Sequence, residues 1–159
     1  MTQKPLFPAP PSRTPASRTQ TNAIKANIDG GARGNPGPAA YGVVVRNAQG
    51  EIIAELAEYL GHQTNNFAEY SGLLAALDYA VREQHLSLKV LSDSELLVKQ
   101  MKGQYRVKNP GLLELYERAR ALVRKLESFS IEHVLREYNR EADALVNKVL
   151  DSRARGARE

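Results

Sequence analysis

The sequence contains no cysteine, and this absence removes several kinds of chemistry at once. Without thiols there are no disulfides, no thiolate metal ligands and no cysteine nucleophiles, so oxygen and histidine remain as the strong metal donors. Any bound metal is therefore expected to be a hard cation.

The sequence also lacks a long apolar run, and its beginning lacks the apolar segment that a secretory signal needs. Membrane insertion and export are therefore not expected, and a cytoplasmic location with no membrane partner is predicted. At 159 residues and 42% hydrophobic, the chain can bury one sizeable core. A single domain follows.

The net charge of +4 is weak support for a nucleic-acid partner, because the excess sits at the two ends of the chain. Lys4, Arg13 and Arg18 have no acidic neighbours in residues 1–22, and residues 151–159 add a further net positive charge. Between these ends the acidic and basic residues balance. Only a local cluster of basic residues could therefore support nucleic-acid binding.

The chain divides into three segments by composition. Residues 1–22 contain many of the prolines among Ser, Thr and Arg, which favours a disordered arm over the amphipathic helix of an organelle transit peptide. Residues 23–150 are predicted to form the folded domain. Residues 151–159 are interpreted as a charged tail.

The hydrophobic pattern predicts three strands, then a strand, two helices, a strand and a last helix. The strands are expected near residues 24–28, 41–46, 51–60, 86–91 and 130–136. The helices are expected near residues 66–84, in a short segment after Asp93 that ends near 101, at 112–127 and from 140 onward. The second and third strands form a hairpin. This order predicts an α/β fold whose mixed five-stranded sheet begins with three antiparallel strands and carries helices on both faces.

Four acids stand where this organisation brings them together. Asp29 ends the first strand, Glu69 opens the first helix, Asp93 follows the fourth strand and Asp143 lies early in the last helix. Each alone is most simply a capping or solvated carboxylate. Together they would repel one another unless a cation compensates, and carboxylate oxygens select magnesium or manganese.

The segments around these acids resemble the signature blocks of the type 1 ribonuclease H family. The blocks are residues 29–39, 64–69, 92–94 and 139–143, each with one acid, and the resemblance covers about residues 23–150. It implies a ribonuclease H-like fold and an endoribonuclease that hydrolyses the RNA strand of RNA/DNA hybrids, leaving 5′-phosphate and 3′-hydroxyl ends.

The resemblance also implies how the four acids act. Two Mg²⁺ or Mn²⁺ ions would be held in each site, with Asp29 bridging both. Glu69 and Asp93 would complete the ligands of one ion, and Asp143 would bind mainly the other. No small-molecule cofactor is implied, and the enzyme is expected to act as a monomer.

The resemblance places the nucleic acid beside the glycine-rich loop, the start of the first helix and the helix after the fourth strand. The candidate contact residues are Gly30, Gly31, Arg33, Gly34, Asn35, Thr64, Asn65, Asn66, Ser94, Lys99 and Lys102. The alternatives are a plain turn for the loop, a helix cap for residues 64–66 and solvated surface for the lysines. The loop is no P-loop, because neither Gly-Lys-Ser nor a helix follows it.

Three features depart from the best-known bacterial pattern. The link before Asp143 is too short for the usual histidine loop, and alternation predicts that His133 is packed inside the fifth strand. The separate basic protrusion is missing, although Lys99 and Lys102 lie in a smaller basic cluster. Glu95 stands where a neutral residue is common, and a carboxylate there either repels nucleic acid or binds cation.

Two other functions remain open at the level of the sequence. One is a catalytically weak module of the same fold that binds hybrids or double-stranded RNA, which is also a second candidate substrate. The other is an integrase-like or resolvase-like nuclease, for which a different set of acids and no glycine loop would be expected.

Overall fold

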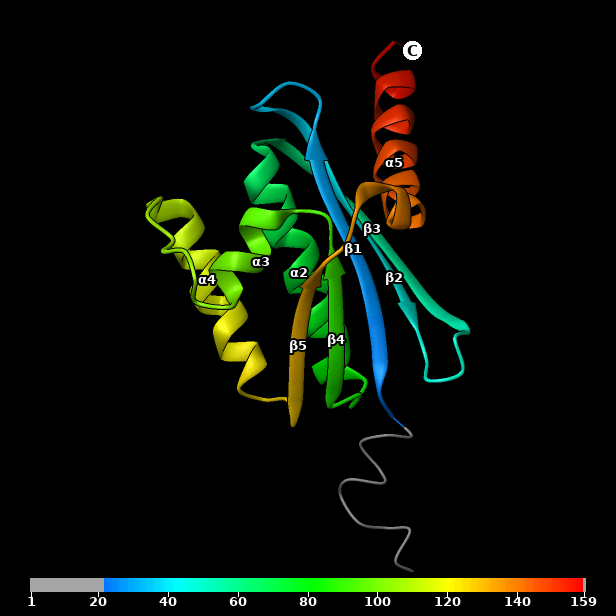
Figure 1. Ribbon diagram of the computed structural model, residues 1–159. Helices are drawn as coiled ribbons and strands as arrows, with labels where there is room; N and C mark the ends of the chain where they lie inside the picture. Colours follow the sequence, from blue (N-terminus) through cyan, green and yellow to red (C-terminus); the bar gives the residue numbers. More distant parts are fainter. Residues whose placement is uncertain (1–21, 159) are drawn as a thin grey trace, which may run out of the picture.

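The computed structural model describes residues 22–158, which form one five-stranded sheet with helices packed on it (Figure 1). The strands and helices, in chain order, are β1 (Ile24–Ala32), β2 (Gly37–Arg46), β3 (Ile52–Gln63), α2 (Asn65–Arg82), β4 (Ser87–Ser92), α3 (Glu95–Met101), α4 (Pro110–Val123), β5 (Ser128–His133), the 3₁₀ turn η2 (Arg136–Tyr138) and α5 (Arg140–Arg158). None of these described helices is long and apolar enough to cross a bilayer.

The sheet has the strand order β3-β2-β1-β4-β5. β1, β2 and β3 are antiparallel neighbours, whereas β4 runs parallel to both β1 and β5. α2, α3 and α4 lie on one face and α5 lies on the other (Figure 1). The predicted mixed sheet with helices on both faces is therefore confirmed.

The main core lies between the sheet and α2. Alternate residues of β1 point into it, and α2 supplies large side chains that are fully buried there, including Tyr70, Leu73 and Leu77. A second, smaller cluster of Ala40, Val146 and Leu150 lies under α5. The two faces of the sheet are thus covered to different extents, since α5 is a single helix.

The last helix corrects the predicted charged tail at residues 151–159. α5 continues past Leu150 to Arg158, because Leu150 is buried and the next turns make contacts of their own. Asp151 forms an ion pair with Arg33 at 2.7 Å, and the Arg153 guanidinium stacks 4.2 Å above the Tyr59 ring. The predicted arm at residues 1–22 lies, except for Asn22, outside the described residues.

Several predicted boundaries are also wrong by a few residues. β1 continues past Asp29 to Ala32 and β2 begins at Gly37, because these extensions pair with each other. α4 begins at Pro110, earlier than expected, because the Asn109 side chain caps it by accepting hydrogen bonds from two backbone N–H groups. The helix ends at Val123, and β5 then begins at Ser128, where the backbone N–H donates to Leu86 O.

Candidate active site

Asp29 and Asp93 are brought together by the parallel pairing of β1 and β4. Ile28 pairs with Ser92, so the next residue of each strand is an acid, and both acids lie at the same edge of the sheet. Ser92 is buried, and its hydroxyl accepts a hydrogen bond from the Ser94 backbone at 3.0 Å. This turn fixes the backbone on both sides of Asp93.

Glu69 reaches the same place because Gly30 allows α2 to approach β1. A Cβ at Gly30 would overlap the Ala68 carbonyl and the Glu69 backbone nitrogen. Without a side chain at position 30, the backbone of α2 lies directly against the strand that carries Asp29. Carboxylate oxygens of Asp29, Glu69 and Asp93 consequently lie within 4.8 Å of one another.

Asp143 is delivered from the opposite face of the sheet by α5. Gly42 on β2 leaves the space for this helix, since a Cβ there would lie 2.5 Å from Ala142 O and 2.8 Å from Leu145 Cβ. The Asp143 carboxylate then lies close enough to Asp29 to raise the pKa of that acid. Four acids from four separate elements therefore line one cleft of about 390 Å³.

The crowding of these carboxylates raises their pKa values. Burial raises the pKa of Asp29 to about 8, with Asp93 and Asp143 adding to the effect. Burial also raises the pKa of Glu69 well above its usual range, and the charges of Asp29 and Asp93 act in the same direction. The pKa of Asp93 is raised by burial, while Arg136 and Asn139 oppose that change.

The donor set fits a divalent cation. Glu69 Oε1 is buried and has no hydrogen-bond partner among the described residues, and such an atom is costly to bury unless something binds it. It belongs to a cluster of carboxylate oxygens, which are ligands that hard cations prefer. Positive charge would also relieve the repulsion that raises these pKa values.

Comparison with known proteins places this geometry in a family. A sequence profile described as reverse transcriptase-like matches residues 27–149. Ribonuclease HI of Halobacterium salinarum is 42% identical over 128 residues, which are 80% of this chain and 64% of that protein. The chain belongs to the ribonuclease H family.

Other members of the ribonuclease H family resemble the chain in sequence and structure. The bifunctional protein Rv2228c of Mycobacterium tuberculosis is 47% identical over 135 residues, which are 84% of this chain and 37% of that protein. The solved N-terminal RNase H domain of Rv2228c superimposes with a TM-score of 0.81 at 45% identity, covering 85% of this chain and 98% of that chain. The chain thus spans about a third of the mycobacterial relative.

A further solved relative is LC11-RNase H1, whose structure is in complex with an RNA/DNA hybrid. It has a TM-score of 0.77 at 40% identity and covers 82% of this chain and 99% of that chain. The ribonuclease H fold expected from the signature blocks is therefore shown by both sequence and structure.

Within this ribonuclease H fold, the polar residues of the glycine-rich loop and of the start of α2 hold one another. Asn65 Oδ1 accepts from Ala32 N at 2.8 Å, and Asn35 Oδ1 accepts from Asn65 N at 3.0 Å. Thr64 Oγ1 caps α2 by accepting from Phe67 N. The loop is thereby fixed at the mouth of the acidic cleft. The Asn66 side chain is exposed beside it.

The other candidate contacts differ in their distance from the cleft. Gly31, Arg33 and Ser94 line the cleft together with the acids. Gly30 also lines it, while Gly34 lies in the exposed turn beyond, with a φ of +91°. Lys99 and Lys102 do not line the cleft. Lys99 pairs with Glu95 at 3.7 Å and lies 4.9 Å above the Tyr105 ring, and Lys102 is exposed.

Two residues that the sequence analysis did not nominate also belong to the site. Asn139 is buried and joins β1 to the start of α5, because its Nδ2 donates to Ile28 O at 2.8 Å and its Oδ1 accepts from Asn27. Arg136 lines the cleft with its Nε 3.8 Å from Asp93 Oδ2. Asn139 lies in a signature block, whereas no periodicity marks Arg136.

His133 is not packed inside β5 as predicted. It is exposed at the end of the strand, where β5 is the edge of the sheet, and Leu135 beyond it is also exposed. Alternation places His133 on the same side as buried Ile131, but His133 is the last residue of an edge strand and is exposed there. His133 lies near enough to Asp93 to oppose, by a small amount, the rise in the pKa of that carboxyl.

Proposed function

We propose that this chain is an endoribonuclease that hydrolyses the RNA strand of RNA/DNA hybrids. The observation that carries the proposal is the convergence of Asp29, Glu69, Asp93 and Asp143 in one cleft of a ribonuclease H fold. The hybrid bound to LC11-RNase H1 supports the choice of substrate. All four acids come from one chain, so a monomer is the proposed active unit.

Two divalent ions, Mg²⁺ or Mn²⁺, are the proposed cofactors. The charge of four ionised carboxylates matches that of two such ions, and Asp29 lies between the other acids because it touches both Asp143 and the Glu69–Asp93 pair. When bound, these ions would supply an activated water and charge neutralisation at the scissile phosphate.

The protein's own residues position the substrate around that centre. The loop from Gly31 to Asn35 is held rigidly by Asn65, so its backbone can approach the sugars of the RNA strand, where 2′-hydroxyls distinguish RNA from DNA. Arg136 sits at the cleft mouth with its side chain 87% exposed. It is free to meet a phosphate there.

The deciding experiment is a cleavage assay with labelled hybrid, double-stranded RNA and duplex DNA, each with Mg²⁺, Mn²⁺ or chelator. The hybrid should be cut with either metal and remain intact in chelator, with 5′-phosphate ends on the products. Asp29→Asn and Asp93→Asn should each reduce the rate by about a thousandfold or more, because the acids act as one unit. Lys148→Gln, an exposed change on α5, is the control.

Other outcomes of the same assay identify the alternatives. Hybrid binding with no cleavage in either metal would mean a binding module, and hybrid cleavage that survives both substitutions would refute the four-acid mechanism. Preferential cleavage of double-stranded RNA would make double-stranded RNA, and not the hybrid, the proposed substrate. A hybrid substrate also implies a compartment that holds both DNA and RNA, which for bacterial and archaeal relatives is the cytoplasm.

A further inference from the structure

A row of basic side chains crosses the sheet far from the acidic cleft. Lys25 on β1 lies directly opposite Arg46 on β2, and on its other side it pairs in register with Lys89 on β4. Neighbouring strands are about 5 Å apart, so three cations follow one another at the closest spacing that a sheet permits. Like charges at directly opposed positions destabilise a sheet.

Two of the three cations are compensated and the central one is not. Arg46 Nη2 lies 2.8 Å and 2.9 Å from the two carboxylate oxygens of Glu141 on α5, and Lys89 Nζ lies 3.4 Å from Glu132 on β5. Between residues 22 and 158, no carboxylate lies within ion-pair distance of Lys25. The row therefore keeps an excess positive charge at its centre.

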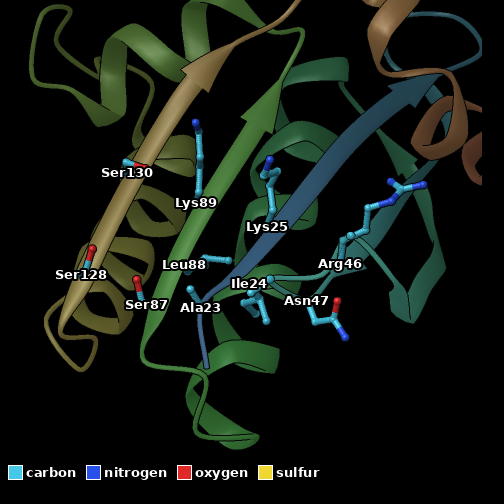
Figure 2. Close-up of a pocket in the computed structure, with 12 residues that line it drawn as sticks. Ala23, Ile24, Lys25, Arg46, Asn47, Ser87, Leu88, Lys89, Ser128 and Ser130 are labelled. Atoms are coloured by element: carbon cyan, nitrogen blue, oxygen red, sulfur yellow. The ribbon is translucent and has the colours of Figure 1, made fainter. Parts of the chain in front are cut away.

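The basic row borders a cavity of about 280 Å³ on the sheet face that α5 leaves uncovered. Figure 2 shows Lys25 and Lys89 extending from the sheet, with Arg46 turned toward α5. The hydroxyl groups of Ser87, Ser128 and Ser130 lie on the far side of the cavity. Ser130 pairs in register with Lys89, which extends the row with a hydrogen-bond donor.

This cavity is separate from the active site. No residue lines both the cavity and the acidic cleft. Lys25 precedes Asp29 by four residues on β1, and Lys89 precedes Asp93 by four on β4, so the strand rise separates the two sites by about 13 Å. The volume is near the lower limit of small-molecule pockets and far below what a duplex needs.

From the cation row, the hydroxyls and the cavity, we infer a second binding site that takes a single phosphate group, either free phosphate or the phosphate of a mononucleotide. Lys25 and Lys89 would contact the phosphate oxygens, and the three serines would donate hydrogen bonds. Arg46 would add positive charge while remaining tied to α5. The apolar wall at Ala23 and Ala48 suits a sugar or base.

The test is titration of the full chain in chelator with inorganic phosphate, adenosine 5′-monophosphate or adenosine, followed by backbone amide NMR. Chelator matters because it removes the divalent ions through which a phosphate could bind in the acidic cleft. Both phosphate compounds should shift the amides of residues 23–25, 87–89 and 128–130 saturably, and adenosine should not. A stronger response to the nucleotide than to phosphate would identify a mononucleotide site, and equal responses a free-phosphate site.

Variants locate the binding in the row. Lys25→Gln and Lys89→Gln should each weaken phosphate binding by about tenfold, the size of one charge-assisted hydrogen bond. Lys148→Gln removes the same charge from an exposed part of α5 and should leave binding unchanged. The inference is overturned if no saturable shifts occur, if adenosine binds as well as its monophosphate, or if Lys148→Gln weakens binding equally.

Hybrid cleavage gives an independent readout. Since the row lies outside the cleft, Lys25→Gln combined with Lys89→Gln should leave kcat/KM for a short hybrid nearly unchanged. A large rise in KM at low salt that shrinks as salt is added would show that the row binds the hybrid, which would overturn the small-phosphate site while leaving the proposed function intact.

Discussion

At the scale of single residues, the site depends on side chains that hold the acids as well as on the acids themselves. Asn139 is the clearest case, because its buried side-chain amide donates to Ile28 O on β1, accepts from Asn27 and opposes the rise in the pKa of Asp93. The Asn139 backbone carbonyl also accepts from Asp143 N at 3.2 Å. It therefore sets the relative positions of two acids that come from opposite faces of the sheet.

Replacing Asn139 by Ala should lower hybrid cleavage by about 10-fold to 100-fold, the usual cost of losing a residue that orients metal ligands. The apparent affinity for Mn²⁺, measured by titrating activity and by calorimetry, should fall with it. His133→Ala is the matched comparison and should leave most turnover, since His133 is exposed and holds none of the acids. Equal effects of the two changes would contradict the positioning role.

Arg136 acts through its charge at the cleft mouth. Arg136→Ala should raise KM for the hybrid by about tenfold and reduce the salt dependence of binding by roughly one unit in slope, because one phosphate contact is lost. Stability should not change, given that the side chain is largely exposed. Arg124→Ala, at the exposed end of α4, controls for net charge. An unchanged salt slope in Arg136→Ala would rule out the phosphate contact.

At the scale of helices and strands, two glycines set where α2 and α5 lie. Gly30 lets α2 bring Glu69 to Asp29, and Gly42 lets α5 bring Asp143 to the same point. Each position faces the backbone of a helix, which cannot turn away as a flexible side chain can. The positions of Glu69 and Asp143 relative to Asp29 therefore depend on the lack of a Cβ at Gly30 and Gly42.

Gly42→Ala should destabilise the protein by about 1–3 kcal/mol, the usual cost of overpacking, and should weaken metal binding because α5 must shift. Urea denaturation and Mn²⁺ titration measure the two effects. Gly156→Ala is the control, since a Cβ there meets nothing within 4 Å and alanine favours the helix. If Gly42→Ala kept wild-type stability and metal affinity, this account of α5 packing would be wrong.

The same elements show what the sequence allowed us to predict. The prediction that Asp29 and Asp93 lie together is correct, because β1 and β4 are parallel and pair in register up to Ile28 and Ser92. The prediction that Asp29 ends its strand is wrong, because β1 continues to Ala32 in its pairing with β2. The exposure of His133 was missed, since alternation shows which side of the sheet a residue faces but not that its strand ends there at the edge of the sheet. The cation row was missed for a related reason: the pairing of Lys25 with both Arg46 and Lys89 depends on register, which is a tertiary property.

At the scale of the whole molecule, the acids make folding depend on pH and metal. In chelator, between about pH 3.8 and about pH 8, folded Asp29 keeps a proton that the unfolded chain has released. Folding then takes up a proton, so stability falls as the pH rises, by up to about 1.4 kcal/mol per pH unit for one group. The raised pKa of Glu69 acts in the same direction.

Thermal or urea denaturation across this pH range should show a decline in chelator that Mg²⁺ removes, because ion binding favours the charged carboxylates. Asp29→Asn should flatten the decline and be more stable than wild type at pH 8 without metal, since it removes one of the crowded acids. A wild-type-like pH slope in Asp29→Asn would mean that Asp29 does not titrate as its burial indicates.

The cleft also joins distant parts of the chain, because Asp29 belongs to the first strand and Asp143 to the last helix. An ion shared by these two carboxylates would link β1 to α5. Its removal would let α5 detach before the rest of the sheet unfolds. Proteases should then cut first in the exposed link around η2, and metal depletion in a cell would mark the protein for degradation as well as stop its chemistry.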